Sequence, residues 1–257
     1  LTKVELPQGL TEIGNYALYG CSSLTSINLP QSVKSIGTHA FLRCTSLTEV
    51  SVPDEATHIG FGAFAECGSL RAITLPFVGE NADGSGKTYF GHIFGANELN
   101  SNGGFVPYRL QTVVLTGGTA ITARAFYECY QLTSITLPES LTSIGDGAFD
   151  YCYKLAEVYN KSALPIQIGS DEYGAVGYYA KNLYTKQEGR SWFTDTADGY
   201  RFLYDGDKGY LLGYFGSQAD LTLPEEFNAY NGAVVTEYEI YDYAFIGSDV
   251  ESVVLSG

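Results

Sequence analysis

The apolar residues of this chain recur at a fixed 23-residue period. Three successive copies at the N-terminus each begin at a leucine and read LTKVELPQGLTEIGNYALYGCSS, LTSINLPQSVKSIGTHAFLRCTS and LTEVSVPDEATHIGFGAFAECGS. A unit this short cannot enclose a core of its own, but stacked units share one continuous core. The period therefore predicts a repeat solenoid in which each copy is one rung.

Two elements are expected within a rung. In LTSINLP, Ile27 and Leu29 alternate with polar neighbours, which indicates a short strand with one face inward. Pro30 ends this strand because proline has no N–H for a ladder bond. Phe41 and Cys44 then follow Ala40 with the spacing of one short helical turn, so we expect a short helical turn on the opposite side of each rung.

The repeat is interrupted twice. The first interruption, about residues 77–109, is rich in Gly and Asn and predicts an ordered loop whose buried aromatics pack on the solenoid. The second contains YRFLYDGDKGYLLGYFG, a β-hairpin signal. We therefore expect repeats over residues 1–158, a β-rich insertion over 159–220 and resumed repeats over 221–257.

The motifs L-x-x-I-x-L-P and I-G-x-x-A-F-x-x-C, both within one period, resemble the BspA-like class of leucine-rich repeat proteins. The resemblance covers the regular rungs at 1–76, 110–158 and 221–257. It implies a right-handed, horseshoe-like β/α stack, secreted or attached to a bacterial surface, and used for adhesion and protein binding. The family motif marks core positions only, so it carries over no ligand-binding residue.

Charge narrows the range of partners. The 14 Lys+Arg and 29 Asp+Glu give a net charge of −15, and no basic cluster is present, which argues against nucleic acid and anionic membranes as partners. No apolar stretch approaches the roughly 20 residues that span a bilayer. The chain begins at Leu1, so we expect a piece of a longer protein, and we expect it to be a monomer.

Residue patterns that support catalysis or cofactor binding are missing. The five cysteines follow the rung at positions 21, 44, 67, 129 and 152, which favours buried thiols over disulfides or a metal site. NADGSGKT lacks the first glycine of a phosphate-binding loop, and the acidic turns lack the spacing of a calcium loop. We therefore expect no enzyme, no cofactor and no metal.

Tyrosine is concentrated in the second half of the chain. Of 21 tyrosines, 15 lie between Tyr151 and Tyr243. Because Tyr and Trp are favoured in protein interfaces, we predict a partner-binding site in the second interruption. Its candidate residues are Tyr178, Tyr179, Trp192, Tyr200 and Tyr204.

Packing across strands is the competing explanation for these tyrosines. The function that we expect is a non-enzymatic module that binds a host or neighbouring-cell protein. The alternatives are a carbohydrate-binding module and a structural spacer within a larger surface protein.

Overall fold

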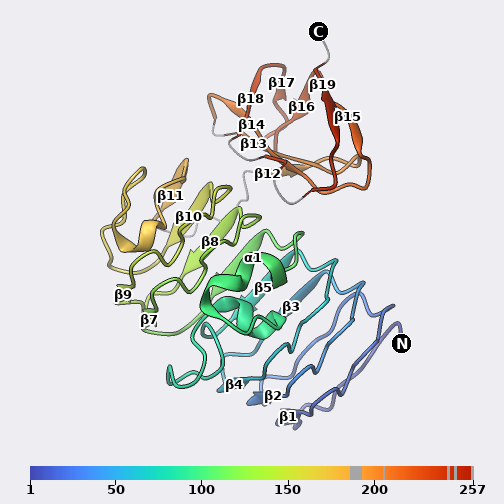
Figure 1. Ribbon diagram of the computed structural model, residues 1–257, viewed down its shortest axis with the longest axis vertical. Coiled ribbons are helices and arrows are strands. Elements are labelled where there is room, and N and C mark those ends of the chain that lie inside the picture. The colour runs from blue at the N-terminus through green and yellow to red at the C-terminus, as the bar shows by residue number, and fades with distance from the viewer. Residues whose placement is uncertain (186–192, 205, 242–243, 246–247, 256–257) are drawn as a thin grey trace. The chain divides into compact units, whose positions relative to one another are not determined.

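The protein forms two compact units, Leu1–Gln187 and Glu188–Gly257, which we call the repeat unit and the C-terminal unit (Figure 1). The structure is a computed structural model that describes residues 1–185, 193–204, 206–241, 244–245 and 248–255. Each unit has a hydrophobic core made of its own residues.

One side of the repeat unit is a six-stranded sheet in which all neighbouring strands pair in parallel. Its strands are β3 (Glu49–Ser51), β5 (Ala72–Leu75), β6 (Thr112–Leu115), β8 (Ser134–Leu137), β10 (Glu157–Asn160) and β11 (Asn182–Tyr184). The pairing keeps the register of the repeat, since Ile73 pairs with Val50 on one side and with Val113 on the other. These three side chains point into the core, as the alternation of apolar and polar residues predicts.

A second set of two-residue strands follows the I-G positions. β1 (Glu12–Ile13), β2 (Ser35–Ile36) and β4 (His58–Ile59) form one parallel ladder, and β7 (Ala120–Ile121) and β9 (Ser143–Ile144) form another. These ladders lie apart from the six-stranded sheet, so a rung can contribute two separate strand segments (Figure 1).

The third side of a rung is a series of tight turns, so the expected short helical turn is wrong. The N–H groups of Ala40 and Cys44 donate to carbonyls three residues back, whereas the N–H of Phe41 donates to Ala63 on the next rung. His39 and Arg43 have positive φ values of 55° and 63°, a conformation that a right-handed helix does not contain. Every second N–H group of this side therefore donates to a carbonyl of the next rung.

The first interruption lies within one enlarged rung and contributes to the core. It contains η1 (Phe90–Phe94), η2 (Leu99–Ser101) and α1 (Asn102–Phe105). The ring of Phe90 lies 4.7 Å from that of Phe126, which in turn stacks on Phe149 at 4.9 Å. The ordered loop and its buried aromatics are therefore present as expected, except that Phe105 is 43% exposed.

Asn102 joins this enlarged rung to the next one. Its side chain is fully buried, with Oδ1 accepting from the Gly91 N–H at 2.7 Å and Nδ2 donating to the carbonyls of Ala125 and Tyr127 at 3.3 and 2.9 Å. A buried amide is stabilised only when its donors and acceptors are paired. Asn102 therefore adds side-chain hydrogen bonds to the backbone bond by which the Phe90 N–H donates to the Ala125 carbonyl of the next rung.

The repeat unit extends past the predicted boundary at residue 158. β11 pairs in parallel with β10, so that Val158 lies opposite Leu183, and the connecting segment contains η3 (Tyr173–Ala175). Residues 159–185 therefore complete a further rung and are not part of a separate β-rich insertion. The structure places the division between the units at residue 187.

The C-terminal unit is built around a four-stranded sheet with the order β12-β13-β14-β18. β13 (Tyr200–Tyr204) and β14 (Gly209–Tyr214) pair antiparallel, as the hairpin signal predicts. β12 (Phe193–Asp195) lies antiparallel to β13, and β18 (Tyr238–Ile240) lies parallel to β14.

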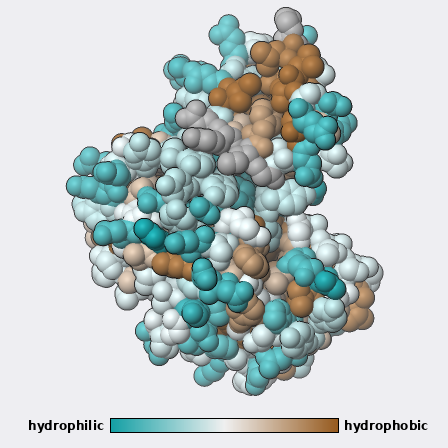
Figure 2. Space-filling view, in the orientation of Figure 1, coloured by the Kyte–Doolittle hydropathy of each residue, from teal (hydrophilic) through white to brown (hydrophobic). Residues whose placement is uncertain are grey.

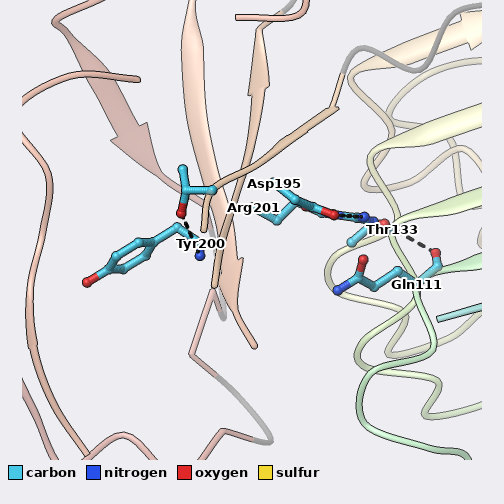
Figure 3. Close-up of polar contacts among 6 residues, drawn as sticks. Gln111, Thr133, Asp195, Tyr200 and Arg201 are labelled. Carbon is cyan, nitrogen blue, oxygen red and sulfur yellow. Dashed lines mark hydrogen bonds and ion pairs between the residues drawn. The ribbon is translucent and has the colours of Figure 1, made fainter. Parts of the chain in front are cut away.

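An ion pair joins the neighbouring strands β12 and β13. Arg201 donates from Nε and Nη2 to the two carboxylate oxygens of Asp195, both at 2.7 Å (Figure 3). Paired hydrogen bonds of this kind are stronger and more directional than a single one.

Two smaller sheets complete the C-terminal unit. β16 (Phe227–Asn228) and β17 (Val234–Val235) pair antiparallel. β15 (Asp220–Thr222) and β19 (Ser252–Val254) pair in parallel, with Leu221 opposite Val253. The family-like repeats predicted to resume at 221–257 stay a prediction.

Candidate binding surface

Six tyrosines of the last rungs form a continuous network of ring contacts, which we call the tyrosine cluster. Its members are Tyr127, Tyr130, Tyr151, Tyr153, Tyr178 and Tyr179. Ring centroids lie 4.9 to 5.9 Å apart, and all of the contacts are edge to face except the stacked pair Tyr130 and Tyr153. These geometries are the favoured ones for aromatic pairs, so the rings hold one another in place.

The exposed end of this cluster borders a hollow of about 280 Å³, which we call the tyrosine pocket. Its lining residues are Asp150, Tyr151, Asp171, Ala175, Tyr178 and Tyr179. Tyr151 and Tyr178 are 43% and 50% exposed, although each is in contact with another ring. Large aromatic surfaces are therefore held open to solvent beside a cavity.

The backbone around the pocket is fixed by the rung. Tyr151 has a φ of 62°, at the turn position that also carries left-handed residues in other rungs. The N–H of Tyr178 donates to Ala175 at 3.1 Å, and the flanking Val176 and Ala180 are buried in the core. The exposed rings thus project from residues that the hydrophobic core holds on both sides.

The pocket is acidic. It is lined by the carboxylates of Asp150 and Asp171 and by no basic residue. Within the part of the chain that the structure describes, neither side chain forms an ion pair or a hydrogen bond. Burial, assisted by the nearby Glu128 carboxylate, raises the pKa of Tyr130 in the adjoining cluster above its usual range.

The residues predicted for partner binding lie in both units. Tyr178 and Tyr179 line the tyrosine pocket of the repeat unit. Tyr204 is half-buried on β13, where its hydroxyl donates to the Gly206 carbonyl at 3.0 Å. Trp192 lies outside the described residues.

Tyr200 does not have the exposure that the sequence predicts for it. It is 6% exposed and packs in the core of the C-terminal unit against Phe202 and Tyr214, with its hydroxyl donating to Thr222 (Figure 3 shows Tyr200 beside the ion-paired Arg201). The reason is that the ring of Tyr200 belongs to the hydrophobic core of this unit, with Leu221 and Leu223 among its members.

Sequence reasoning missed Tyr151, Asp150 and Asp171 as parts of this surface. One signal for the cluster was available: Tyr130 and Tyr153 are one repeat period apart, which places them side by side on successive rungs. The next rung has a longer spacing, with Glu157 paired to Asn182, so Tyr178 and Asp171 fall outside the 23-residue register.

All five cysteines are free thiols, and four of them are buried as predicted, whereas Cys21 is half-buried. Cys67 donates from Sγ to the Phe41 carbonyl at 3.3 Å, and Cys152 donates likewise to Phe126 at 3.2 Å. Burial raises the pKa of Cys67 to about 12 and raises that of Cys152 further. The thiol, unlike the thiolate, is a weak nucleophile and a poor metal ligand, so these cysteines serve the core.

Other titratable groups show no arrangement suited to catalysis in the described residues. His92 is buried, burial lowers its pKa, and its ring nitrogens have no hydrogen-bond partner there. The loop that contains Asn81, Asp83 and Ser85 is closed by its own hydrogen bonds. Across that same part of the chain, no group of three or more His, Cys, Asp or Glu side chains is placed to hold a metal ion.

Two other surfaces offer fewer anchoring groups. The strand side carries a hollow of about 260 Å³ with small and mainly polar lining residues such as Ser26, Asn28 and Thr74. The C-terminal unit exposes apolar side chains, including Val234, Ile240 and Val254. Figure 2 shows brown, apolar surface on this unit. The tyrosine pocket combines a cavity, exposed aromatic rings and charge.

Parallel strands in register, a core of recurring Leu, Ile and Phe, and turn-to-turn backbone bonds define the repeat unit as a leucine-rich repeat protein. The family model described as BspA type Leucine rich repeat region matches six copies over residues 1–85 and 105–171, more than half of the chain. The chain belongs to this family.

Solved structures of bacterial proteins include chains similar to this one. A leucine-rich repeat protein of T. pallidum is 28% identical, with 72% of this chain and 67% of that chain covered and a TM-score of 0.32. A leucine-rich cell surface protein of Faecalibacterium prausnitzii is 23% identical, with 96% and 59% covered and a TM-score of 0.39. This chain thus spans little more than half of the F. prausnitzii structure.

No curated protein matches the sequence significantly. In the described residues, none of the helices has both the length and the apolar character needed to cross a bilayer.

Proposed function

We propose that this chain is a non-enzymatic interaction module of a bacterial cell-surface or secreted protein, and that it binds a protein partner through the tyrosine pocket. Membership of the BspA-type family supports the class of function. The observation that carries the site is the exposure of Tyr151 and Tyr178 beside a hollow of about 280 Å³.

The energetics of interfaces favour this surface. Binding energy in protein interfaces concentrates in a few residues, and Tyr is among the most enriched because it adds a large contact area at a small entropic cost. The rings of Tyr151 and Tyr178 are already restrained by Tyr153 and Tyr179. Little ordering entropy is therefore lost when a partner covers them.

An array of host extracellular-matrix proteins and glycans, probed with the full chain, tests the proposal. We expect a protein to be captured, and the double variant Tyr151→Ala/Tyr178→Ala to weaken its binding at least tenfold. The matched control is Tyr16→Ala/Tyr19→Ala, which removes two tyrosines of similar exposure, 54% and 50%, from the first rung. Binding by the control should equal that of the unmodified chain.

Each other result changes the assignment in a defined way. Capture of glycans alone would make the chain a carbohydrate-binding module. Protein binding that survives the double variant would move the site away from the tyrosine pocket. Capture of neither class would leave the function of a spacer.

A further inference from the structure

The lining of the tyrosine pocket has a definite chemical bias. Asp150 and Asp171 supply two negative charges, and the lining contains no lysine, arginine or histidine. Neither carboxylate forms an ion pair or hydrogen bond within the described part of the chain. A ligand that covers this pocket therefore has to compensate two carboxylates that the protein itself leaves unpaired.

A cationic group satisfies this requirement better than a neutral one. Removing a carboxylate from water is costly unless a positive partner replaces the lost hydration. The faces of tyrosine rings also attract cations, by about 0.5–2 kcal/mol depending on desolvation. A neutral sugar would gain the ring contacts but would leave both charges uncompensated.

Size and shape favour arginine among the cationic side chains. A hollow of about 280 Å³ takes one side chain and is at the lower limit for a drug-sized ligand. The planar guanidinium stacks on aromatic rings and forms paired hydrogen bonds to carboxylates, whereas the compact ammonium of lysine does neither. The net charge of −15 also accelerates the approach of a basic partner.

We propose that the tyrosine pocket binds an arginine side chain of the partner protein, with the guanidinium against the rings of Tyr151 and Tyr178 and paired with Asp150 and Asp171. This inference rests on the proposed function, because it specifies the partner group that the same surface recognises.

Short peptides test the inference directly. The full chain, labelled with ¹³C in its tyrosine rings, is titrated with the peptide acetyl-Gly-Ser-Arg-Ser-Gly-amide while the ring resonances are recorded. We expect saturable shifts at Tyr151 and Tyr178. The same peptide with citrulline, which keeps the shape of arginine but has no charge, should bind at least tenfold more weakly, and the lysine peptide should fall between the two.

Substitutions show whether the two carboxylates of the pocket contribute to peptide binding. Asp150→Asn and Asp171→Asn should each weaken the arginine peptide several-fold, whereas Glu139→Gln, which removes an exposed carboxylate elsewhere on the repeat unit, should leave its affinity unchanged. Raising the salt from 0.05 to 0.5 M should weaken binding because an exposed ion pair is screened. Circular dichroism of each variant checks that it is folded.

Equal affinity for the arginine and citrulline peptides would overturn the inference, as would unchanged binding in both aspartate variants or shifts confined to Tyr16 and Tyr19. Absence of any shift at the pocket would also overturn it. In that case, a partner from the array whose binding still depends on Tyr151 and Tyr178 would show that the proposed function stands without an arginine.

Discussion

The α-carbon of Gly60 faces the backbone of Thr38 on the preceding rung so closely that an added Cβ would lie 2.5 Å from the Thr38 nitrogen. Gly145 meets the same obstacle at the Ala123 nitrogen, 2.4 Å away. Gly14 occupies the equivalent position of the first rung and has nothing within 4 Å of its own added Cβ. Glycine is therefore required at Gly60 and Gly145, where the backbone of the preceding rung lies against the I-G motif.

This relationship predicts opposite outcomes for two alanine substitutions at equivalent positions. Gly60→Ala should lower the free energy of unfolding by about 1–3 kcal/mol or more, because the new methyl group would push against backbone atoms. Gly14→Ala should change it by less than about 0.5 kcal/mol. Urea unfolding followed by circular dichroism measures both, and equal effects would show that close rung contact is not the reason for the glycine.

Asn102 should be essential to the enlarged rung. Asn102→Ala removes the buried partner of the Gly91 N–H and of the Tyr127 carbonyl, while the Ala125 carbonyl keeps the Phe90 N–H. We therefore expect a loss of about 2 kcal/mol in unfolding free energy. Amide hydrogen exchange at Gly91 should accelerate as well. Asn97→Ala, at an exposed position in the same segment, is the control, and a comparable loss there would argue against a specific role for Asn102.

Tyr200 should contribute to the stability of the C-terminal unit and not to partner binding. Tyr200→Ala removes a ring that packs in the core of the C-terminal unit, and we expect a cost of about 3–5 kcal/mol. Tyr200→Phe removes only the hydrogen bond to Thr222 and should cost about 1 kcal/mol. Thermal unfolding distinguishes the two variants. A large loss of partner binding with unchanged stability would instead restore Tyr200 as a contact residue.

Thiol labelling should reveal one cysteine of five. Cys21 is half-buried on the first rung, whereas Cys44, Cys67, Cys129 and Cys152 are buried, and burial raises their pKa values. Because the thiolate is the reacting form, Ellman's reagent at pH 8 should titrate only Cys21 in the native protein and all five after denaturation. Rapid reaction of all five without denaturant would contradict the buried ladder.

Stability should fall at alkaline pH. Burial raises the pKa of Cys44 to about 11 and that of Cys67 to about 12, and it raises the pKa values of Cys129 and Cys152 as well. A raised pKa means that the folded state keeps the proton to a higher pH than the unfolded state does. The contribution of the buried thiols to the free energy of unfolding is therefore complete below a pH of about 9 and is lost as the pH rises above it. Each thiol should contribute a slope of about 1.4 kcal/mol per pH unit.

One buried group opposes this trend. Burial lowers the pKa of Lys154 to about 8, so its effect on stability becomes more favourable as the pH rises from 8 to its ordinary 10.5. Once the thiols of the unfolded chain ionise, the four thiols change the free energy of unfolding more than the one lysine does. Denaturant titrations between pH 9 and 10 should therefore show a net decline in the free energy of unfolding. Cys129→Ala/Cys152→Ala should flatten that decline, and an unchanged slope would assign it to other groups.

The strand side of the fold follows directly from the sequence. Alternation of apolar and polar residues sets which way a strand side chain points, and a fixed period sets which residue lies opposite in the next rung. Ile27, Ile73 and Val113 are accordingly buried. The hairpin of β13 and β14 was predictable for the same reason, since two aromatic runs flank a turn signal.

The turn side was not predictable from spacing alone. Phe41 and Cys44 face the core in a helical turn and in consecutive tight turns alike, so their pattern does not distinguish the two. What decides is the left-handed backbone at His39 and Arg43, residues that give no signal comparable to glycine. The last rung was missed because its lengthened spacing displaces its L-P and I-G motifs, Leu164-Pro165 and Ile168-Gly169, from the 23-residue register. This displacement conceals the pairing of Val158 with Leu183.

The binding surface was predictable in part. The abundance of tyrosine led to Tyr178 and Tyr179, but composition does not separate exposed rings from buried ones such as Tyr200. Asp150 and Asp171 are two acids among 29, and only the fold places both beside the exposed rings.

The enlarged rung has a consequence for how such proteins diversify. Ala72 pairs with Thr112 across the whole first interruption as regularly as Glu49 pairs with Ala72 across an ordinary rung. Strand pairing in the sheet therefore does not depend on how many residues connect two strands. Foreign segments inserted on the turn side of a rung should therefore be tolerated if they supply a buried ring and a bridging amide, as Phe90 and Asn102 do. A single scaffold can thereby display different loops without any change in its strands.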